Sequence, residues 1–490
     1  MTSSKSTKRA LITSALAILM CAAMLIGTTF AWFTDTASTG VNKIVSGNLK
    51  VDIIGADSDS HIEKLNFTKA ATTDAEAGAE ILWEPGCRYL TEGFRIANKG
   101  NLALKWKAQV NTGTTAANEG NFDLLDVIDF YLVTKAADGT ETETALDEFT
   151  GNLKKTETSD VYYIKGVMQT TAGNEYQGLT LDGISITVVA TQDTVESDSF
   201  DNQYDKDAEY PILVTTGDEL QAIVSNATAP VNIVLTNSIT TNNFVIPEDK
   251  DVTLDLNGRT VTNAGSHTIL NKGHLTLTDS SADKSGQIIS LKGNTAALRN
   301  GDNAVCVVEG GTISRDGANG NTWHVVENFG KMTFNGGKVV LKNGNGFAIT
   351  NGWNYFDPGA STTHAVMEIN ALELDTDSSG IKNCRYGDLT VNDVTVTSTG
   401  YWALSNDYLG TAVINGGTLT SNSFKAVSNG AAMTVNGGTF DGTAGFFVQS
   451  YATSTVLNGG TFANMNVDAL SSYVGTGHTA QQSGTSVIIK

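Results

Sequence analysis

The chain has 490 residues, of which 52 are acidic and 31 basic, so its formal net charge is −21 at pH 7. That charge argues against binding to nucleic acid or to an anionic lipid surface, because both need basic patches. Hydrophobic residues make up 40 % of the chain and charged residues 17 %, a composition that can bury a core. The 50 glycines and only 5 prolines favour many tight turns between short strands.

The first segment, residues 1–31, has the pattern of a signal peptide. A basic start is followed by an apolar stretch over residues 11–26 and then by small residues. We therefore expect cleavage between Ala31 and Trp32 and a secreted or cell-surface protein. The alternative is an uncleaved signal that anchors the chain in the membrane, since the apolar stretch is close to the shortest length that spans a bilayer.

Two groups of short motifs carry a family resemblance. The first is Phe30-Ala31-Trp32-Phe33-Thr34-Asp35 with Ser46-Gly47-Asn48-Leu49-Lys50-Val51 after it, and the second is Trp83-Glu84-Pro85-Gly86 followed by residues 96–107. The chain resembles the camelysin/TasA family of Gram-positive bacteria over residues 20–110, and weakly as far as residue 195. The resemblance implies export through an ER-type signal peptidase and a place in the extracellular matrix, in a biofilm or in adhesion.

The resemblance also implies that the segment from Trp32 and Phe33 to Val41 adds as a strand to the next subunit and so builds fibres. An extended peptide satisfies the open edge of a neighbouring sheet, and head-to-tail addition does not close into a ring. The alternative is an ordinary first strand within its own domain.

The family name carries a metalloprotease activity that the residues do not support. A zinc protease of the HExxH type needs two histidines four residues apart on a helix, with a glutamate as base. The six histidines lack this spacing: His61, His267, His274, His324, His364 and His478.

Residues 32–195 are strand-like. Leu49, Val51 and Ile53 alternate with polar residues, as do Leu104 and Trp106 in the run after residue 101. Polar turns separate further β-rich runs at 127–133, 161–167 and 184–190. This pattern predicts a jelly-roll-like β-sandwich.

Residues 196–212 form an acidic linker, which we expect to be solvated. Its carboxylates could bind calcium weakly at the surface, and we expect no other cofactor. Residues 216–227 predict one short helix with Leu220, Ile223 and Val224 on a shared face, placed to cover the open end of the C-terminal region.

Residues 213–490 contain a repeat of about 22 residues, marked by segments such as Val413-Ile414-Asn415-Gly416-Gly417-Thr418 and Thr434-Val435-Asn436-Gly437-Gly438-Thr439. Three short strands and three turns per coil fit that period. The repeat predicts a parallel β-helix of about nine coils with a short helical cap. Its right-handed sense follows from the crossover rule and from its similarity to pectate-lyase-like β-helix proteins.

A second repeated triplet ends in asparagine, which tolerates tight turn geometry and can bond to the coil above. We interpret it as a structural ladder rather than a catalytic feature. Its members are Asn271, Asn300, Asn328, Asn351, Asn383, Asn406 and Asn429.

Aromatic residues in the insertions suggest a surface for sugars. Trp353, Tyr355 and Tyr408 lie in predicted loops, where rings can stack on a cell-wall or host polysaccharide. Aromatic residues at strand starts are expected in the core instead: Phe347, Phe424 and Phe446.

No catalytic residue is assigned. A glycosidase needs two carboxylates across the scissile bond, and the candidate acids do not form an evident pair: Asp375, Asp377, Asp388, Asp393 and Asp407. The sequence therefore predicts a structural protein of the matrix or adhesion type. The alternatives are a β-helix that binds or cleaves carbohydrate and a membrane-tethered stalk.

Overall fold

The computed structural model describes most of the chain after residue 47. The described ranges are 48–62, 65–68, 83–111, 114–115, 122–146, 149–182, 185–193, 209–263, 265–317, 323–353 and 363–490. The expected cleavage point at Ala31 and Trp32, the expected assembly segment with Phe33 and Val41, the aromatic Tyr355 and most of the acidic linker lie outside these ranges.

The N-terminal part folds into antiparallel sheets. The largest has seven strands, with β10 joining β4, β3 and β7. Its strands are β1 (Val51–Gly55), β2 (Phe67–Thr68), β3 (Arg88–Thr91), β4 (Phe94–Asn98), β7 (Ile128–Lys135), β8 (Glu141–Ala145) and β10 (Tyr162–Met168). A second sheet has the order β12-β5-β9, from β5 (Leu104–Asn111), β9 (Phe149–Leu153) and β12 (Ser185–Gln192).

These two sheets share one apolar core. Phe94 and Ile96 of the larger sheet pack in the same cluster as Leu104 and Trp106 of β5. The predicted alternation along β5 is confirmed, because Leu104, Trp106 and Ala108 are buried while the residues between them are half-buried. The short elements of this part are β6 (Thr114–Thr115), β11 (Leu181–Asp182) and the 3₁₀ turns η2 (Leu124–Asp126) and η3 (Asn174–Tyr176).

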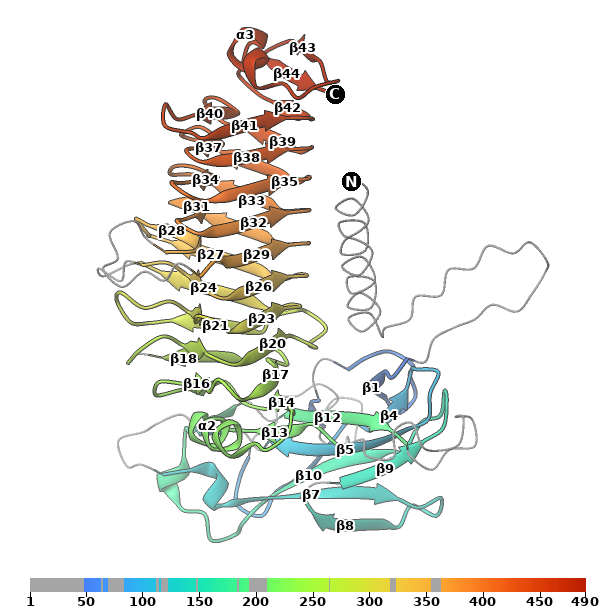
Figure 1. Cartoon of the computed structure of the whole chain (residues 1–490). Helices are drawn as coiled ribbons and strands as arrows, with labels where there is room; N and C mark the ends of the chain where they lie inside the picture. The colour runs from blue at the N-terminus through green and yellow to red at the C-terminus, as the bar shows by residue number, and fades with distance from the viewer. Residues whose placement is uncertain are drawn as a thin grey trace, which may run out of the picture. The chain divides into compact units, whose positions relative to one another are not determined.

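The C-terminal part is a β-solenoid of about ten turns over residues 212–462, which confirms the parallel β-helix (Figure 1). It has about one turn more than the nine that the sequence predicts, because β13 (Ile212–Val214) and β14 (Val231–Leu235) come before the first Asn-Gly corner. At about 4.8 Å per turn the stack is roughly 50 Å long.

Three parallel sheets run the length of the solenoid, and we call them S1, S2 and S3. Sheet S1 contains β13 (Ile212–Val214), β14 (Val231–Leu235), β17 (Asp251–Asp255), β20 (His274–Thr278), β23 (Val305–Val308), β26 (Lys331–Phe334), β29 (Ala365–Ile369), β32 (Gly387–Val391), β35 (Thr411–Ile414), β38 (Ala432–Val435) and β41 (Ser454–Leu457).

Sheet S2 follows S1 in each turn. It contains β15 (Ile239–Thr240), β18 (Thr260–Asn263), β21 (Gln287–Ser290), β24 (Thr312–Asp316), β27 (Lys338–Lys342), β30 (Glu373–Thr376), β33 (Thr395–Ser398), β36 (Thr418–Ser421), β39 (Thr439–Asp441) and β42 (Gly460–Phe462), and then the antiparallel β44 (Ser486–Ile489) and β43 (Ala480–Ser483).

Sheet S3 completes each turn, and seven of its nine strands end at the asparagine of the repeated triplet. It contains β16 (Val245–Ile246), β19 (Ile269–Asn271), β22 (Leu298–Asn300), β25 (Val326–Asn328), β28 (Phe347–Asn351), β31 (Ser379–Asn383), β34 (Leu404–Asn406), β37 (Val427–Asn429) and β40 (Phe446–Val448).

The corner between S1 and S2 explains the repeated Gly-Gly pair. The second glycine of each pair has a backbone that side chains rarely adopt, with φ of 98° at Gly417 and 110° at Gly438. Glycine has no Cβ and takes this left-handed conformation at no steric cost. The motif is therefore a requirement of the turn.

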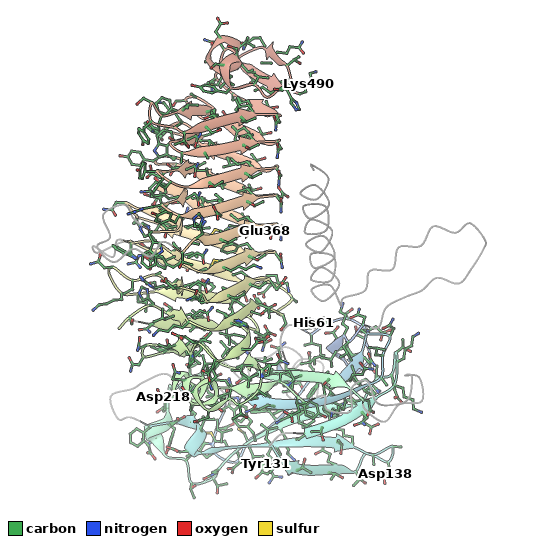
Figure 2. The ribbon with its side chains drawn as sticks, in the orientation of Figure 1. His61, Tyr131, Asp138, Asp218, Glu368 and Lys490 are labelled. Carbon is green, nitrogen blue, oxygen red and sulfur yellow. The ribbon has the colours of Figure 1, made fainter. Side chains whose placement is uncertain are left out.

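Both ends of the solenoid are covered. Helix α2 (Gly217–Asn226) begins after the N-cap Thr216 and buries Leu220 and Val224, as the sequence predicts. At the other end β44 pairs with β42, and α3 (Val467–Leu470) with the turn η5 (Ser471–Tyr473) lies beside them. Figure 2 labels Asp218 on α2 and Lys490 at the end of the chain.

Candidate functional site

The asparagine triplets form a continuous buried ladder at the end of sheet S3. Each side-chain amide donates to the amide oxygen of the next turn at 2.7–2.9 Å, from Asn271 through to Asn429. All seven of these amides also donate to a backbone carbonyl of the coil. Since every amide has partners and is buried, the ladder is a structural element and holds no free group for a ligand.

A second ladder lies at the corner between S1 and S2, on the solvent side. There the amides of Asn370, Asn392, Asn415, Asn436 and Asn458 each donate to the asparagine of the preceding turn. The donors of this outer ladder point toward the start of the solenoid, whereas those of the inner ladder point toward its end.

A hollow on the outer face of sheet S3 is the candidate site. Its volume is about 260 Å³, and strands β22, β25, β28 and β31 supply its floor. The register places one file of outward side chains across these strands: Arg299, Glu327, Thr350 and Lys382. Aromatic side chains close its sides: Trp323, Phe329 and Phe347.

The central carboxylate of the hollow is Glu327, whose side chain is only 4 % exposed. One oxygen accepts a hydrogen bond from the Trp323 indole at 2.9 Å, and the other pairs with the Arg299 guanidinium at 3.1 Å. A buried charge needs such partners, because an unpaired one is expensive to remove from water. Glu327 thereby fixes one aromatic wall and one cation of the hollow.

Cations and rings are stacked around the hollow. The Arg299 guanidinium lies 4.6 Å from the centre of the Phe329 ring, and the Lys382 ammonium lies 5.4 Å from that of Phe347. Phe329 also contacts Trp353, with ring centres 4.5 Å apart. The Trp353 indole nitrogen is buried and has no hydrogen-bond partner in the described ranges.

Two histidines near the hollow are held in their neutral form. Burial lowers the pKa of His324, with the Glu327 charge opposing, and burial also lowers the pKa of His267. His324 Nδ1 lies 3.0 Å from the Phe347 carbonyl, and His267 Nδ1 accepts from the Ala296 amide at 2.8 Å. The neutral imidazoles add no positive charge to this face, where Arg299 and Lys382 are the cations.

Of the aromatic residues expected to bind sugars, the two in the described ranges lie in different turns of the solenoid. Trp353 packs beside the hollow, whereas Tyr408 follows β34, two turns further along. Two core predictions are wrong: Phe347 and Phe424 are half-exposed, and only Phe446 is buried. The reason is register, since Phe347 and Phe424 come two or three residues before the inward position that Phe446 occupies in its own turn.

Sequence reasoning missed Arg299, Glu327 and Lys382. The signal was present in the triplets Leu298-Arg299-Asn300, Val326-Glu327-Asn328 and Ile381-Lys382-Asn383. In each, the apolar residue and the asparagine point inward, so the residue between them must point outward. The middle residues of these triplets in successive turns therefore form the outward file that lines the hollow.

The candidate acids do not converge. Asp407 pairs with Lys382 at 3.2 Å, Asp388 with His364 at 2.8 Å and Asp375 with Lys342 at 2.8 Å. Among the described residues, no group of three or more His, Cys, Asp or Glu side chains is placed to hold a metal ion. None of the helices in the described ranges has the length and apolar character that crossing a membrane requires.

The three cysteines in the described ranges, Cys87, Cys306 and Cys384, form no disulfide. Cys306 and Cys384 are buried, and burial raises the pKa of both thiols to about 12, so they remain protonated and unreactive. Cys87 is half-buried in the N-terminal part.

Comparison with known proteins adds no relative. No family model matches the chain, and neither the curated proteins nor the solved structures gave a match.

Proposed function

We propose that the chain is an exported surface protein whose β-solenoid binds a glycan on the outer face of sheet S3. The observation that supports this is the hollow around Glu327, where aromatic rings flank a file of charged and polar groups. Sugar rings have apolar faces that stack on aromatic side chains and hydroxyl groups that bond to polar ones. Ligand sites commonly combine apolar walls with a few fixed polar groups in this way.

Binding fits this hollow better than cleavage. Hydrolysis by the usual route needs two carboxylates on opposite sides of the scissile bond. Among the described residues that line the hollow, Glu327 is the single carboxylate, and both its oxygens are engaged by Trp323 and Arg299. The site is therefore organised to hold a ligand.

Export and a place in the matrix rest on the sequence alone. The signal pattern before Trp32 and the TasA-like motifs support a secreted, cell-surface protein processed by an ER-type signal peptidase. Fibre formation through residues 32–41 stays a prediction. Electron microscopy of the chain from Trp32, beside one that lacks residues 32–41, tests it: filaments from the longer chain alone support strand donation, and single particles from both contradict it.

Affinity electrophoresis tests the glycan proposal. The chain from Trp32 is run through native gels that contain hydroxyethylcellulose, xylan, glycol chitin or alginate. We expect retardation in at least one gel, and a large loss of it in Trp323→Ala and Phe347→Ala. Phe122→Ala, an exposed ring of the N-terminal part, is the control and should run as the unaltered chain. Equal mobility of the unaltered chain in all four gels and in a plain gel overturns the proposal.

A further inference from the structure

A second group of rings lies on the same face of the solenoid, closer to its C-terminal end. Trp402 contacts Phe424 edge-on with ring centres 4.7 Å apart, and it stacks on Phe447 at 6.1 Å. Tyr401, 59 % exposed, contacts Phe424 at 5.8 Å. We call Tyr401, Trp402, Phe424 and Phe447, with Lys425, the upper cluster.

The upper cluster faces the same way as the hollow. In the parallel register Lys382 pairs with Ser405, Ser405 with Ser428 and Ser428 with Phe447. These residues continue the outward file that begins at Arg299 and Glu327. Phe447 therefore stands on the same surface as the hollow, whereas its neighbour Phe446 points into the core.

The upper cluster surrounds one lysine. The Lys425 ammonium lies 3.4 Å from the centre of the Phe447 ring and within 6 Å of the ring centres of Trp402 and Phe424. Among the described residues, no carboxylate lies within ion-pair distance of it. An ammonium group has three donors, so Lys425 can bond to sugar oxygens while the rings stack on sugar faces.

The distance between the hollow and the upper cluster along sheet S3 is short enough for one extended ligand to reach both. From β28 at the hollow to β40 at the upper cluster there are four steps of sheet S3, which is about 19 Å at ~4.8 Å per step. Lys382 belongs to the hollow, and between it and Phe447 the file holds only the small, buried side chains of Ser405 and Ser428. One turn rises by nearly the length of one sugar unit in an extended chain.

We propose that the upper cluster is a second subsite for the same glycan, which lies along sheet S3 parallel to the solenoid axis. This inference rests on the proposed function. Two linked subsites make the second contact intramolecular, so a polymer that spans both binds more tightly than a fragment that reaches only one. The ligand class is an extended polysaccharide with flat-faced rings, rather than a terminal mono- or disaccharide.

The test compares polymer and fragment. Dissociation constants are measured by affinity electrophoresis for whichever of hydroxyethylcellulose, xylan, glycol chitin and alginate retards the unaltered chain most, and by calorimetry for the trisaccharide of the same backbone. We expect Trp402→Ala and Phe447→Ala to weaken polymer binding about tenfold and to leave trisaccharide binding unchanged. Trp323→Ala should weaken both.

Two gentler variants keep the test valid if ring removal disturbs folding. Tyr401→Ala removes an exposed side chain, and Lys425→Gln keeps most of the side-chain volume while it removes the charge; each should weaken polymer binding about threefold. Phe122→Ala is again the control.

The outcomes separate the two proposals. An unaltered chain that no gel retards overturns the glycan function and this inference together. Retardation of the unaltered chain with no change in any upper-cluster variant overturns the second subsite and leaves the glycan function standing. An equal loss of polymer and trisaccharide binding also overturns it, because the cluster would then belong to a single site.

Discussion

At the residue scale, the two asparagine ladders differ in burial. Asn351 is fully buried: its amide donates to Asn383 and to two backbone carbonyls, and its oxygen accepts from Asn328. Asn415 makes similar amide contacts, but in water. Removing the hydrogen-bond partner of a buried polar group lowers the free energy of unfolding far more than removing the partner of an exposed one, because water can replace only the exposed partner.

Asn351→Ala should therefore destabilise the solenoid by about 2–4 kcal/mol, because it removes a hydrogen-bond partner of the buried side chains of Asn328 and Asn383. The matched change Asn415→Ala should cost less than about 1 kcal/mol. Urea unfolding followed by circular dichroism measures both, and equal losses would contradict the structural role of burial in the inner ladder.

The neutral histidines predict a loss of stability in acid. Burial lowers the pKa of His267 and His324 in the folded chain, so the unfolded chain takes up protons first as pH falls below about 6.5. Stability should decrease from pH 7 toward pH 5. The drop in melting temperature over this range should shrink in His267→Gln and His324→Gln but not in His478→Gln, an exposed control. The same drop in all three variants would refute this.

At the element scale, the ends of the solenoid are its weak points. Each turn is stabilised by contacts with its neighbours, so an end turn has one neighbour fewer. Helix α2 supplies the missing contact at the start by burying Leu220 and Val224. The hairpin of β43 and β44 supplies it at the end by pairing with β42.

Leu220→Ala should loosen the first turns specifically. Removing a fully buried leucine costs about 2–5 kcal/mol, and in a repeat fold the loss falls on the nearest turns. Hydrogen exchange should accelerate in β14 and β17 and stay unchanged in β35 and β38. Ile223→Ala, on the half-buried side of the helix, should have a smaller effect. Uniform acceleration along the solenoid would contradict this.

At the scale of the whole molecule, the covered ends oppose end-to-end stacking of solenoids. An open sheet edge pairs readily with another chain. Removal of residues 463–490 takes away β44 and exposes the edge of β42. This shortened chain should form larger species by light scattering, and Thr461→Lys within it should restore single particles, because edge lysines block pairing. A shortened chain that stays monomeric would show that the cap is dispensable.

Local pattern along the chain was enough to predict the parallel solenoid, its helical cap and the inner ladder. The Asn-Gly-Gly corners and the asparagine triplets are local requirements of each turn, so they repeat visibly in the chain. The all-β N-terminal part was predicted for the same reason, because alternation along strands such as β5 is local.

The candidate site, by contrast, exists only in three dimensions. Arg299, Glu327 and Lys382 are 28 and 55 residues apart along the chain, and only the register of β22, β25 and β31 brings them to one face. The side on which Phe347 and Phe424 lie was also beyond local pattern, because their offsets of two and three residues from the inward position become visible only when the turns are aligned in sheet S3. The fold can be predicted from the sequence because every turn repeats the same local requirements. A site that combines residues of several turns cannot, because insertions of different length change the sequence spacing between residues that become neighbours.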